Sequence, residues 1–325
     1  MKKVLVTGGM GFIGSHFIRS ALKNHSDWSV INLDKLTYAG NPKNLSDVEQ
    51  NERYEFIRGD ICDEVLVQRV MREVSLIVNF AAESHVDRSI DSAEDFIQTN
   101  IQGTRVLLDA TRKNKVDLYF HVSTDEVYGS IKEGNFSETT PLAPNSPYAS
   151  SKAGADLLVL AYVKTYGLPA IISRASNNYG PFQYPEKVIP LFVTRLIEKK
   201  KLPLYGQGLN VREWIYVEDH CRAIDLLIQK GKRGEVYNVG SSEEVTNIEL
   251  SKRILALFNL PDSWIEHVTD RLGHDFRYSL NTQKIRSLGF APGTRFDAGL
   301  RQTVDWYIKN EAWWQPLKRD VYTVK

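Results

Sequence analysis

The sequence predicts an α/β fold, with a doubly wound parallel sheet and a smaller, partly interleaved C-terminal domain. In the first half of the chain, short apolar runs rich in Val, Ile, Leu and Phe alternate with longer segments of helical period. This alternation is typical of buried parallel strands that are connected by helices. In the second half, helical segments are separated by loops rich in Gly, Pro and aromatic residues. The length of 325 residues is enough for two folded units.

Each predicted element can be assigned to a stretch of sequence. The apolar runs predict strands at residues 3–6, 29–33, 55–57, 76–80, 118–122 and 170–173. The segments between and after them predict helices at residues 12–24, 64–73, 93–114, 148–166, 188–199, 217–229, 247–258 and 295–310. The run at residues 236–239 reads as one more strand of the main sheet. We therefore expect one domain at residues 1–175, completed by a strand near residues 235–240, and a second domain at residues 176–325.

The composition excludes several classes of protein. With 42% hydrophobic and 25% charged residues, the chain is an ordinary globular one. Its 41 Lys and Arg residues balance 40 Asp and Glu residues, so no overall field attracts nucleic acid or an anionic membrane. No apolar run approaches a membrane span of about 18 residues, and early glycines argue against a secretory signal. Cys62 and Cys221 lie far apart without metal-binding spacing, so we expect no metal site and a cytoplasmic location.

A glycine-rich motif follows the first expected strand. Gly8, Gly11 and Gly14 stand in the spacing G-x-x-G-x-x-G, where the next helix begins. Such a turn needs positive φ, close approach of the backbone to a pyrophosphate, and tight packing of helix on strand. The second strand ends at Asp34, whose carboxylate would bind ribose hydroxyls and repel a 2′-phosphate. The pattern predicts NAD rather than NADP, although adjacent Lys35 argues the other way and Asp34 could be a simple turn residue.

A second motif contains candidate catalytic residues. Tyr148 and Lys152 are four residues apart, so a helix places both side chains on one face. A free tyrosine has a pKa of about 10, and a neighbouring ammonium or a positively charged nicotinamide ring lowers it. Tyr148 could then act as a base, while Lys152 could hold the nicotinamide ribose. The pair alone occurs by chance in many helices, and the glycine motif makes it specific.

These motifs resemble those of the extended short-chain dehydrogenases/reductases, and closely those of the dTDP-glucose 4,6-dehydratases. The resemblance extends through GGMGFIGSHF, LDKLTYAGN, GDICD, NFAAESHVDRS, STDEVYG, SPYASSKAGAD, RASNNYGPFQYPEK, VREWIYVEDHC, YNVG and DRLGHDFRY. It implies a Rossmann domain and a homodimer formed through helices 93–114 and 148–166. The distinguishing feature is Thr124-Asp125-Glu126, because similar epimerases lack the two acids and related decarboxylases keep only a Ser-Glu version.

The resemblance implies conversion of dTDP-glucose to dTDP-4-keto-6-deoxyglucose and water, a step of 6-deoxysugar biosynthesis such as the rhamnose pathway. Tyr148 and NAD would oxidise C4, Glu126 would remove the C5 proton, and Asp125 would protonate the departing C6 hydroxyl. Hydride would then return to C6, and Thr124 would stabilise charge on the C4 oxygen. Burial and a like charge on Glu126 should raise the pKa of Asp125 enough for this. The alternative is that the two acids only cap a short helical segment.

The resemblance also assigns binding residues to both ligands. For the cofactor these are Gly8, Gly11, Phe12, Ile13, Gly14, Asp34, Lys35, Leu36, Thr37, Asp60, Ile61, Phe80, Ala81, Ala82, Ser84, Thr99, Tyr148, Lys152 and Asn178. For the nucleotide sugar they are Ser84, Thr124, Asn177, Lys187, Val188, Pro203, Tyr205, Arg212, Asn247, Arg271 and His274. The guanidinium groups of Arg212 and Arg271 suit phosphate oxygens. Several assignments have a structural alternative: Asp60 could be a helix cap, Tyr205 a core residue and His274 an ordinary loop residue.

The same residues are also compatible with other functions. A UDP-glucose 4,6-dehydratase would differ mainly in its base contacts. An NAD-dependent nucleotide-sugar epimerase or decarboxylase would keep Tyr148 and Lys152 but would not need Asp125. A non-catalytic NAD-sensing regulator of this fold typically loses the tyrosine or the lysine, and this chain has both.

Overall fold

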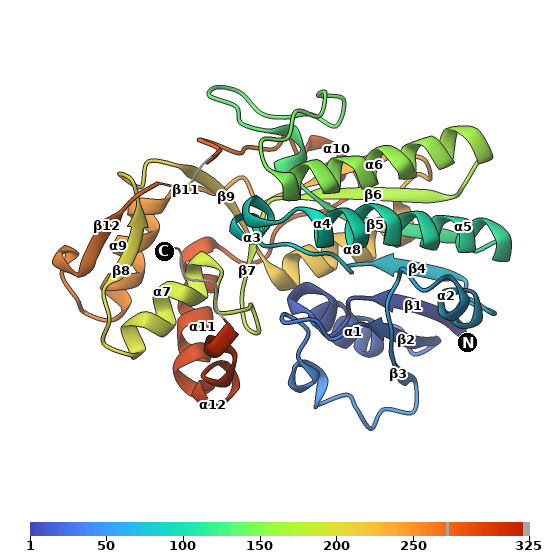
Figure 1. The fold of residues 1–325 in the computed structure, drawn as a ribbon, viewed down its shortest axis with the longest axis horizontal. Helices are drawn as coiled ribbons and strands as arrows, with labels where there is room; N and C mark the ends of the chain where they lie inside the picture. Colours follow the sequence, from blue (N-terminus) through green and yellow to red (C-terminus); the bar gives the residue numbers. More distant parts are fainter. Residues whose placement is uncertain (271–272, 321–325) are drawn as a thin grey trace.

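A seven-stranded parallel sheet forms the centre of the computed structural model, which describes residues 1–270 and 273–320 (Figure 1). The strand order is β10-β6-β5-β4-β1-β2-β3, and every neighbouring pair is parallel. The strands are β1 (Lys2–Thr7), β2 (Trp28–Asp34), β3 (Tyr54–Arg58), β4 (Leu76–Asn79), β5 (Leu118–Thr124), β6 (Ala170–Ala175) and β10 (Val236–Val239). The predicted doubly wound sheet is thus confirmed, and the run at 236–239 adds its edge strand.

Helices cover both faces of this sheet. Helices α1 (Phe12–Asn24) and α8 (Val217–Lys230) share one apolar core with Val4 and Val6 of β1. The opposite core contains Leu5 and is covered by α2 (Glu64–Val70), α5 (Thr104–Asn114) and α6 (Pro147–Tyr166). Neighbouring residues of β1 therefore face opposite layers, as a strand buried on both sides requires.

The segment predicted as one helix at residues 93–114 has three parts. Helix α4 (Glu94–Phe96) leads into a π-helical segment, η2 (Ile97–Gly103), and α5 completes it. Short elements elsewhere in this half are η1 (Pro42–Leu45), α3 (Val86–Asp91) and η3 (Asp125–Tyr128). A π-helical turn often marks a functional site, and Thr99 of η2 lines the pocket described below.

The C-terminal half adds a second group of elements around its own core. Strand β9 (Val211–Tyr216) pairs in parallel with β7 (Asn177–Tyr179) and antiparallel with β11 (Glu244–Thr246), and β8 (Leu202–Tyr205) pairs with β12 (Ile265–Val268). The helical elements are α7 (Val188–Ile197), α9 (Asn247–Leu257), η4 (Asp262–Trp264), α10 (Gln283–Ser287), α11 (Phe296–Lys309), α12 (Glu311–Trp314) and η5 (Pro316–Asp320).

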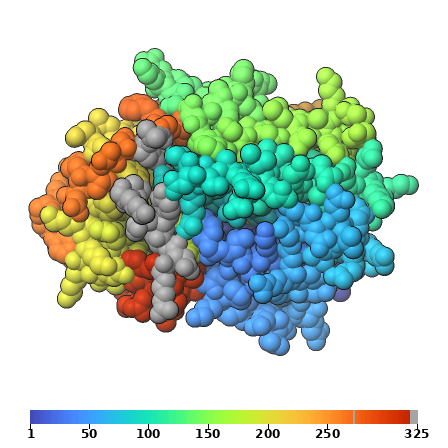
Figure 2. All heavy atoms as spheres, in the orientation of Figure 1, coloured from blue at the N-terminus to red at the C-terminus, as the bar shows by residue number. Residues whose placement is uncertain are grey.

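The two groups lie side by side in the space-filling view, with the blue-to-green N-terminal half on one side and yellow-to-red elements on the other (Figure 2). Aromatic side chains, among them Trp214, Phe296 and Trp314, pack the second core. Over the described ranges 1–270 and 273–320, the search for membrane spans finds no helix long and apolar enough.

Candidate active site

The main pocket opens at the carboxyl ends of the parallel strands, next to β1. After β1 the chain adds β2 and β3 on one side, and it later adds β4, β5 and β6 on the other. Loops leaving strands on either side of such a switch point diverge and leave a crevice. The pocket there is lined by Gly8 at the end of β1, Asp34 at the end of β2 and Thr124 at the end of β5.

The glycine turn leaves no room for side chains. Gly8 has φ +71°, and a Cβ atom on it would lie 2.6 Å from the backbone nitrogen of Ala81. A Cβ atom on Gly14 would lie 2.5 Å from the Gly8 carbonyl oxygen. Helix α1 then begins at Phe12, and its N-cap residue Gly11 has no side chain to cap the first amides. Backbone amides at a helix N-terminus suit a pyrophosphate, so this turn fits a dinucleotide.

Asp34 is held rigidly at one end of the pocket. Its two carboxylate oxygens accept hydrogen bonds from the backbone amides of Met10 and Leu36, both at 2.8 Å. Burial raises the pKa of this carboxyl, although the two amides act in the opposite direction. Lys35 is occupied by an ion pair with Asp60 at 2.8 Å. Each Asp34 oxygen has a second lone pair, so the carboxylate can still accept from ribose hydroxyls.

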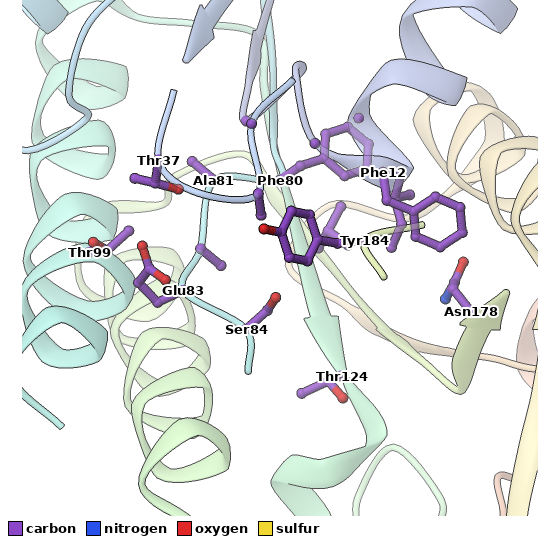
Figure 3. A pocket seen from close by; sticks show the side chains of 18 of the residues that line it. Phe12, Thr37, Phe80, Ala81, Glu83, Ser84, Thr99, Thr124, Asn178 and Tyr184 are labelled. Carbon is purple, nitrogen blue, oxygen red and sulfur yellow. The ribbon is translucent and has the colours of Figure 1, made fainter. Parts of the chain in front are cut away.

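The loop after β4 forms the adjacent wall, where Glu83 and Ser84 lie (Figure 3). Buried Asn100 of η2 holds this loop in place with two hydrogen bonds. Its side-chain oxygen accepts from the Glu83 amide at 2.9 Å, and its side-chain nitrogen donates to the Glu83 carbonyl at 3.0 Å. The Asn100 side chain also donates to Ser151 Oγ of α6 at 2.8 Å. The π-helical segment thus connects the pocket wall to the helix that carries Tyr148 and Lys152.

Thr124, Asp125 and Glu126 follow the end of β5. The Thr124 hydroxyl accepts from the Glu126 amide at 3.3 Å, and it lies 3.2 Å from Asp125 Oδ1. Asp125 is buried, and its Oδ2 atom has no hydrogen-bond partner among the residues described. Burial, followed by the charges of Glu126 and Glu213, raises the pKa of Asp125 well above its usual value, whereas Arg212 lowers it. Asp125 is therefore suited to hold a proton at neutral pH.

Tyr148 and Lys152 face the same pocket from α6. Lys152 Nζ donates to the Val122 carbonyl at 2.7 Å, and burial lowers the pKa of this lysine to about 8. Burial and the charge of Glu126 raise the pKa of Tyr148, while a hydrogen bond with Thr124 lowers it. This differs from the simple expectation of a lowered tyrosine pKa, because burial and the nearby carboxylates Glu126, Asp125 and Asp156 all raise it. Added positive charge beside the phenol is needed to make Tyr148 a base.

The structure brings most of the expected site residues to this single pocket. Those that line it are Gly8, Gly11, Phe12, Ile13, Gly14, Asp34, Lys35, Thr37, Asp60, Ile61, Phe80, Ala81, Ala82, Ser84, Thr99, Thr124, Asp125, Glu126, Tyr148, Lys152, Asn177, Asn178 and Lys187. Leu36 is not among the lining residues, and its amide bonds Asp34.

Six of the expected substrate contacts lie outside the lining of this pocket: Val188, Pro203, Tyr205, Arg212, Asn247 and His274. Tyr205 and His274 form an edge-to-face pair with ring centres 6.0 Å apart. Arg212 lies over the Tyr278 ring at 4.4 Å and donates to the Asp275 carbonyl at 2.9 Å. The positive charge of Arg212 nevertheless lowers the pKa of Asp125. Arg271 lies outside the described residues.

Several pocket residues are not singled out by sequence reasoning. They include Tyr38, Glu83, Ser176, Gln183, Tyr184, Glu186 and His220. Tyr184 projects into the middle of the view in Figure 3, where its ring packs edge-to-face on Tyr38 at 5.3 Å. Most of these residues belong to segments that carry the family resemblance, but no spacing rule marks them individually.

Comparison with known proteins agrees with this geometry. A family model described as GDP-mannose 4,6 dehydratase matches residues 5–303. The chain belongs to this family. Among dehydratases of the family, it is 52% identical to a dTDP-glucose 4,6-dehydratase from Streptomyces niveus, over 97% of this chain and 96% of the relative.

Two solved dTDP-glucose 4,6-dehydratases are closely similar to this chain in fold. The enzyme from Streptomyces venezuelae, crystallised with NAD and dTDP, has a TM-score of 0.96 and 52% identity, covering 97% of this chain and 99% of that one. The enzyme from Bacillus anthracis, in complex with NAD, has a TM-score of 0.92 and 50% identity, covering 98% of this chain and 100% of that one.

Proposed function

We propose that this dehydratase is an NAD-dependent dTDP-glucose 4,6-dehydratase, which forms dTDP-4-keto-6-deoxyglucose and water for 6-deoxysugar biosynthesis. The observation that carries the proposal is the placement of Asp125 and Glu126 in one pocket with Tyr148 and the glycine turn. An epimerase needs a base and NAD, but it has no use for a buried acid with a raised pKa. The full-length similarity to dTDP-glucose 4,6-dehydratases supports the same choice.

The proposed cofactor site uses the glycine turn for the pyrophosphate, Asp34 and Asp60 for the adenosine end, and Tyr148 and Lys152 for the nicotinamide end. The remaining expected contacts, including Thr37, Thr99 and Asn178, line the same pocket. When bound, NAD supplies reversible redox chemistry, so that hydrogen leaves the sugar at C4 and returns at C6. Tyr148 would lie beside the positively charged nicotinamide ring, where its phenolate form would be favoured.

The chain's own residues would carry out the proton transfers of the reaction. Tyr148 accepts the proton of the C4 hydroxyl, while Thr124 donates a hydrogen bond to the C4 oxygen. The resulting 4-ketone makes the C5 hydrogen acidic, and Glu126 removes it. Asp125 gives its proton to the C6 hydroxyl, which leaves as water. The proton gained by Tyr148 balances the one lost by Asp125. Glu126, whose proton can exchange with solvent, returns a proton to C5.

For the second domain, we propose that residues 176–325 bind the nucleotide sugar and that residues 1–175, with β10, form the cofactor domain. Asn177 and Lys187 line the pocket, and the charge of Arg212 reaches Asp125, so a diphosphate could extend from the pocket toward Arg212. Val188, Pro203, Tyr205, Asn247, Arg271 and His274 remain proposed substrate contacts. Both cysteines, Cys62 and Cys221, are free thiols, which suits a reducing cytoplasm.

The substrate is tested by incubating the pure protein with dTDP-glucose and, separately, with UDP-glucose. We expect rapid formation of the 4-keto-6-deoxy product from dTDP-glucose and slower formation from UDP-glucose. Mass spectrometry measures the product by its loss of one water molecule. Faster turnover of UDP-glucose would keep the reaction but change the base that the enzyme prefers. If neither sugar loses water, the proposed function is wrong.

Cofactor choice gives a further prediction. The unmodified protein should bind NAD more tightly than NADP, because the Asp34 carboxylate repels a 2′-phosphate. Asp34→Asn should narrow this gap, since it removes the charge and keeps an acceptor for the Met10 or Leu36 amide. Asp34→Ala should narrow the gap but also destabilise the turn, because both amides lose their acceptor. Dissociation constants from calorimetry test this, and equal affinities in the unmodified protein would contradict it.

We also propose a homodimer formed through the 93–114 and 148–166 helices. The η2 segment and α6 are neighbours (Figure 1), and each exposes a large apolar side chain, Ile97 at 51% and Leu157 at 57%. Leu157→Glu should weaken the dimer, because a charge would be buried at the interface. Leu209→Glu is the matched control, since Leu209 is equally exposed (57%) but lies between β8 and β9. Sedimentation equilibrium tests this, and a monomeric unmodified protein would overturn it.

A further inference from the structure

Three linked polar side chains lie where the chain leaves β6. Asn178 belongs to β7, Gln183 to the loop that follows, and His220 to the first turn of α8. All three line the main pocket. In Figure 3 the Asn178 side chain lies on the opposite side of the view from Glu83 and Thr99. Neither the glycine motif nor the proposed proton transfers give His220 or Gln183 a role.

Hydrogen bonds define the orientation of the Asn178 amide. Its Nδ2 atom donates to the Ser176 carbonyl at 3.0 Å, so its Oδ1 atom is the one that meets His220. His220 Nδ1 lies 2.9 Å from that oxygen. Because an amide oxygen can only accept, Nδ1 must carry the imidazole hydrogen.

His220 is neutral and therefore presents an acceptor. The residue is fully buried, and burial lowers its pKa to about 3. A neutral imidazole with its hydrogen on Nδ1 has a lone pair on Nε2. This Nε2 atom is buried and has no hydrogen-bond partner among residues 1–270 and 273–320.

Gln183 presents a second acceptor by the same reasoning. Its Nε2 atom donates to the Asn178 carbonyl at 2.9 Å, so the other end of its amide is the oxygen. That Oε1 atom is also buried and lacks a partner in the described part of the chain. Buried acceptors without donors are costly, and these two belong to residues that line one binding pocket. They suit a ligand group with N–H donors and would repel phosphate oxygens.

We propose that His220, together with Gln183, binds the carboxamide NH₂ of the nicotinamide. This inference rests on the proposed function, because it takes NAD as the cofactor. NAD has primary amino donors only on its adenine and its carboxamide. The adenosine end is proposed to bind at Asp34 and Asp60, which follow β2 and β3. Asn178 lies on the other side of the sheet's centre, after β6. Strand β6 pairs with β5, which ends at Thr124. Holding the carboxamide would decide which face of the nicotinamide ring meets the sugar.

The test compares NAD with 3-acetylpyridine adenine dinucleotide, which keeps the carbonyl group but has a methyl group in place of the NH₂. Dissociation constants are measured by calorimetry on protein freed of cofactor. We expect the unmodified protein to bind the analogue at least about tenfold more weakly than NAD, because its buried acceptors lose their donors. Equal binding of the two dinucleotides would overturn the proposal.

Two variants of His220 separate its two nitrogen atoms. His220→Asn keeps a donor for Asn178 and removes the acceptor of Nε2. The preference for NAD over the acetylpyridine analogue should then fall to about threefold, because the Gln183 acceptor is still present. His220→Gln keeps an acceptor near the position of Nε2 and should retain most of the preference. If His220→Asn keeps the full preference, or if both variants lose it equally, the proposal is wrong.

His16→Asn is the matched control, because His16 is another buried histidine that bonds the Pro181 carbonyl and does not line the pocket. It should leave the preference unchanged, and a loss there would overturn the assignment to His220. If circular dichroism shows that His220→Asn does not fold, Gln183→Met supplies the second test and should also reduce the preference. A protein that prefers NAD but does not dehydrate dTDP-glucose would contradict only the proposed function, since these measurements need no turnover.

Discussion

Tyr148→Phe should fold and bind NAD, yet oxidise C4 of dTDP-glucose about 10²–10⁴-fold more slowly, because it loses the general base. The substitution keeps the ring, which packs edge-to-face on Phe96 at 6.3 Å, and keeps the backbone amide that donates to Ser89 Oγ. Single-turnover kinetics, followed by the near-ultraviolet absorbance of the reduced cofactor, measure this step separately from later ones.

Tyr119→Phe is the matched control for this loss of a hydroxyl group. Tyr119 is fully buried in β5, where its hydroxyl accepts from Asn79 at 3.1 Å. Its removal should cost about 1 kcal/mol of unfolding free energy and leave C4 oxidation unchanged. Near-normal oxidation by Tyr148→Phe would mean that another group accepts the C4 proton.

Glu126→Gln should stop the reaction after C4 oxidation. The substitution preserves size and hydrogen bonding but removes the base, so removal of the C5 proton should slow by about 10²–10⁴-fold. In deuterated water this variant should reach the oxidised 4-keto complex without exchange at C5, as followed by mass spectrometry. Asp125→Asn, which loses only the proton donor, should still allow C5 exchange while release of water slows.

Glu83→Gln serves as the control for changing a carboxyl group in the same pocket. Glu83 lies near Thr99 in Figure 3, away from Thr124, and burial raises its pKa. It should retain C5 exchange and dehydration. Unchanged dehydration by Glu126→Gln would leave the overall reaction standing and would show that Glu126 is not the C5 base.

Most of the main sheet could be predicted because its strands, apart from the more exposed edge strand β3, are buried on both faces and therefore appear as apolar runs. The run at residues 236–239 was recognisable for the same reason, and Val239 is fully buried. The π-helical segment at Ile97–Gly103 was not, since its apolar spacing resembles that of an ordinary helix. Its geometry reflects tertiary contacts such as the bonds from Asn100 to the β4 loop.

The candidate site could be predicted where function depends on local spacing. The glycine turn and the Tyr148–Lys152 pair depend on neighbours in the sequence, and the structure places them in one pocket. His220 depends on a tertiary contact, because it bonds Asn178 from helix α8, 42 residues away in the sequence. Gln183 bonds Asn178 from the loop that follows β7, and no spacing rule marks that contact. The raised pKa of Tyr148 also could not be read from spacing, since burial sets it.

One isotope experiment with the unmodified enzyme tests the proposed dehydration directly. The enzyme is given dTDP-glucose that carries deuterium at C4, in ordinary water, and the product is analysed by NMR. The proposed reaction gives a 4-keto-6-deoxy product with the deuterium at C6 and none at C5. A product epimerised at C4 that still carries its 6-hydroxyl, or a 6-deoxy product without deuterium at C6, would contradict it.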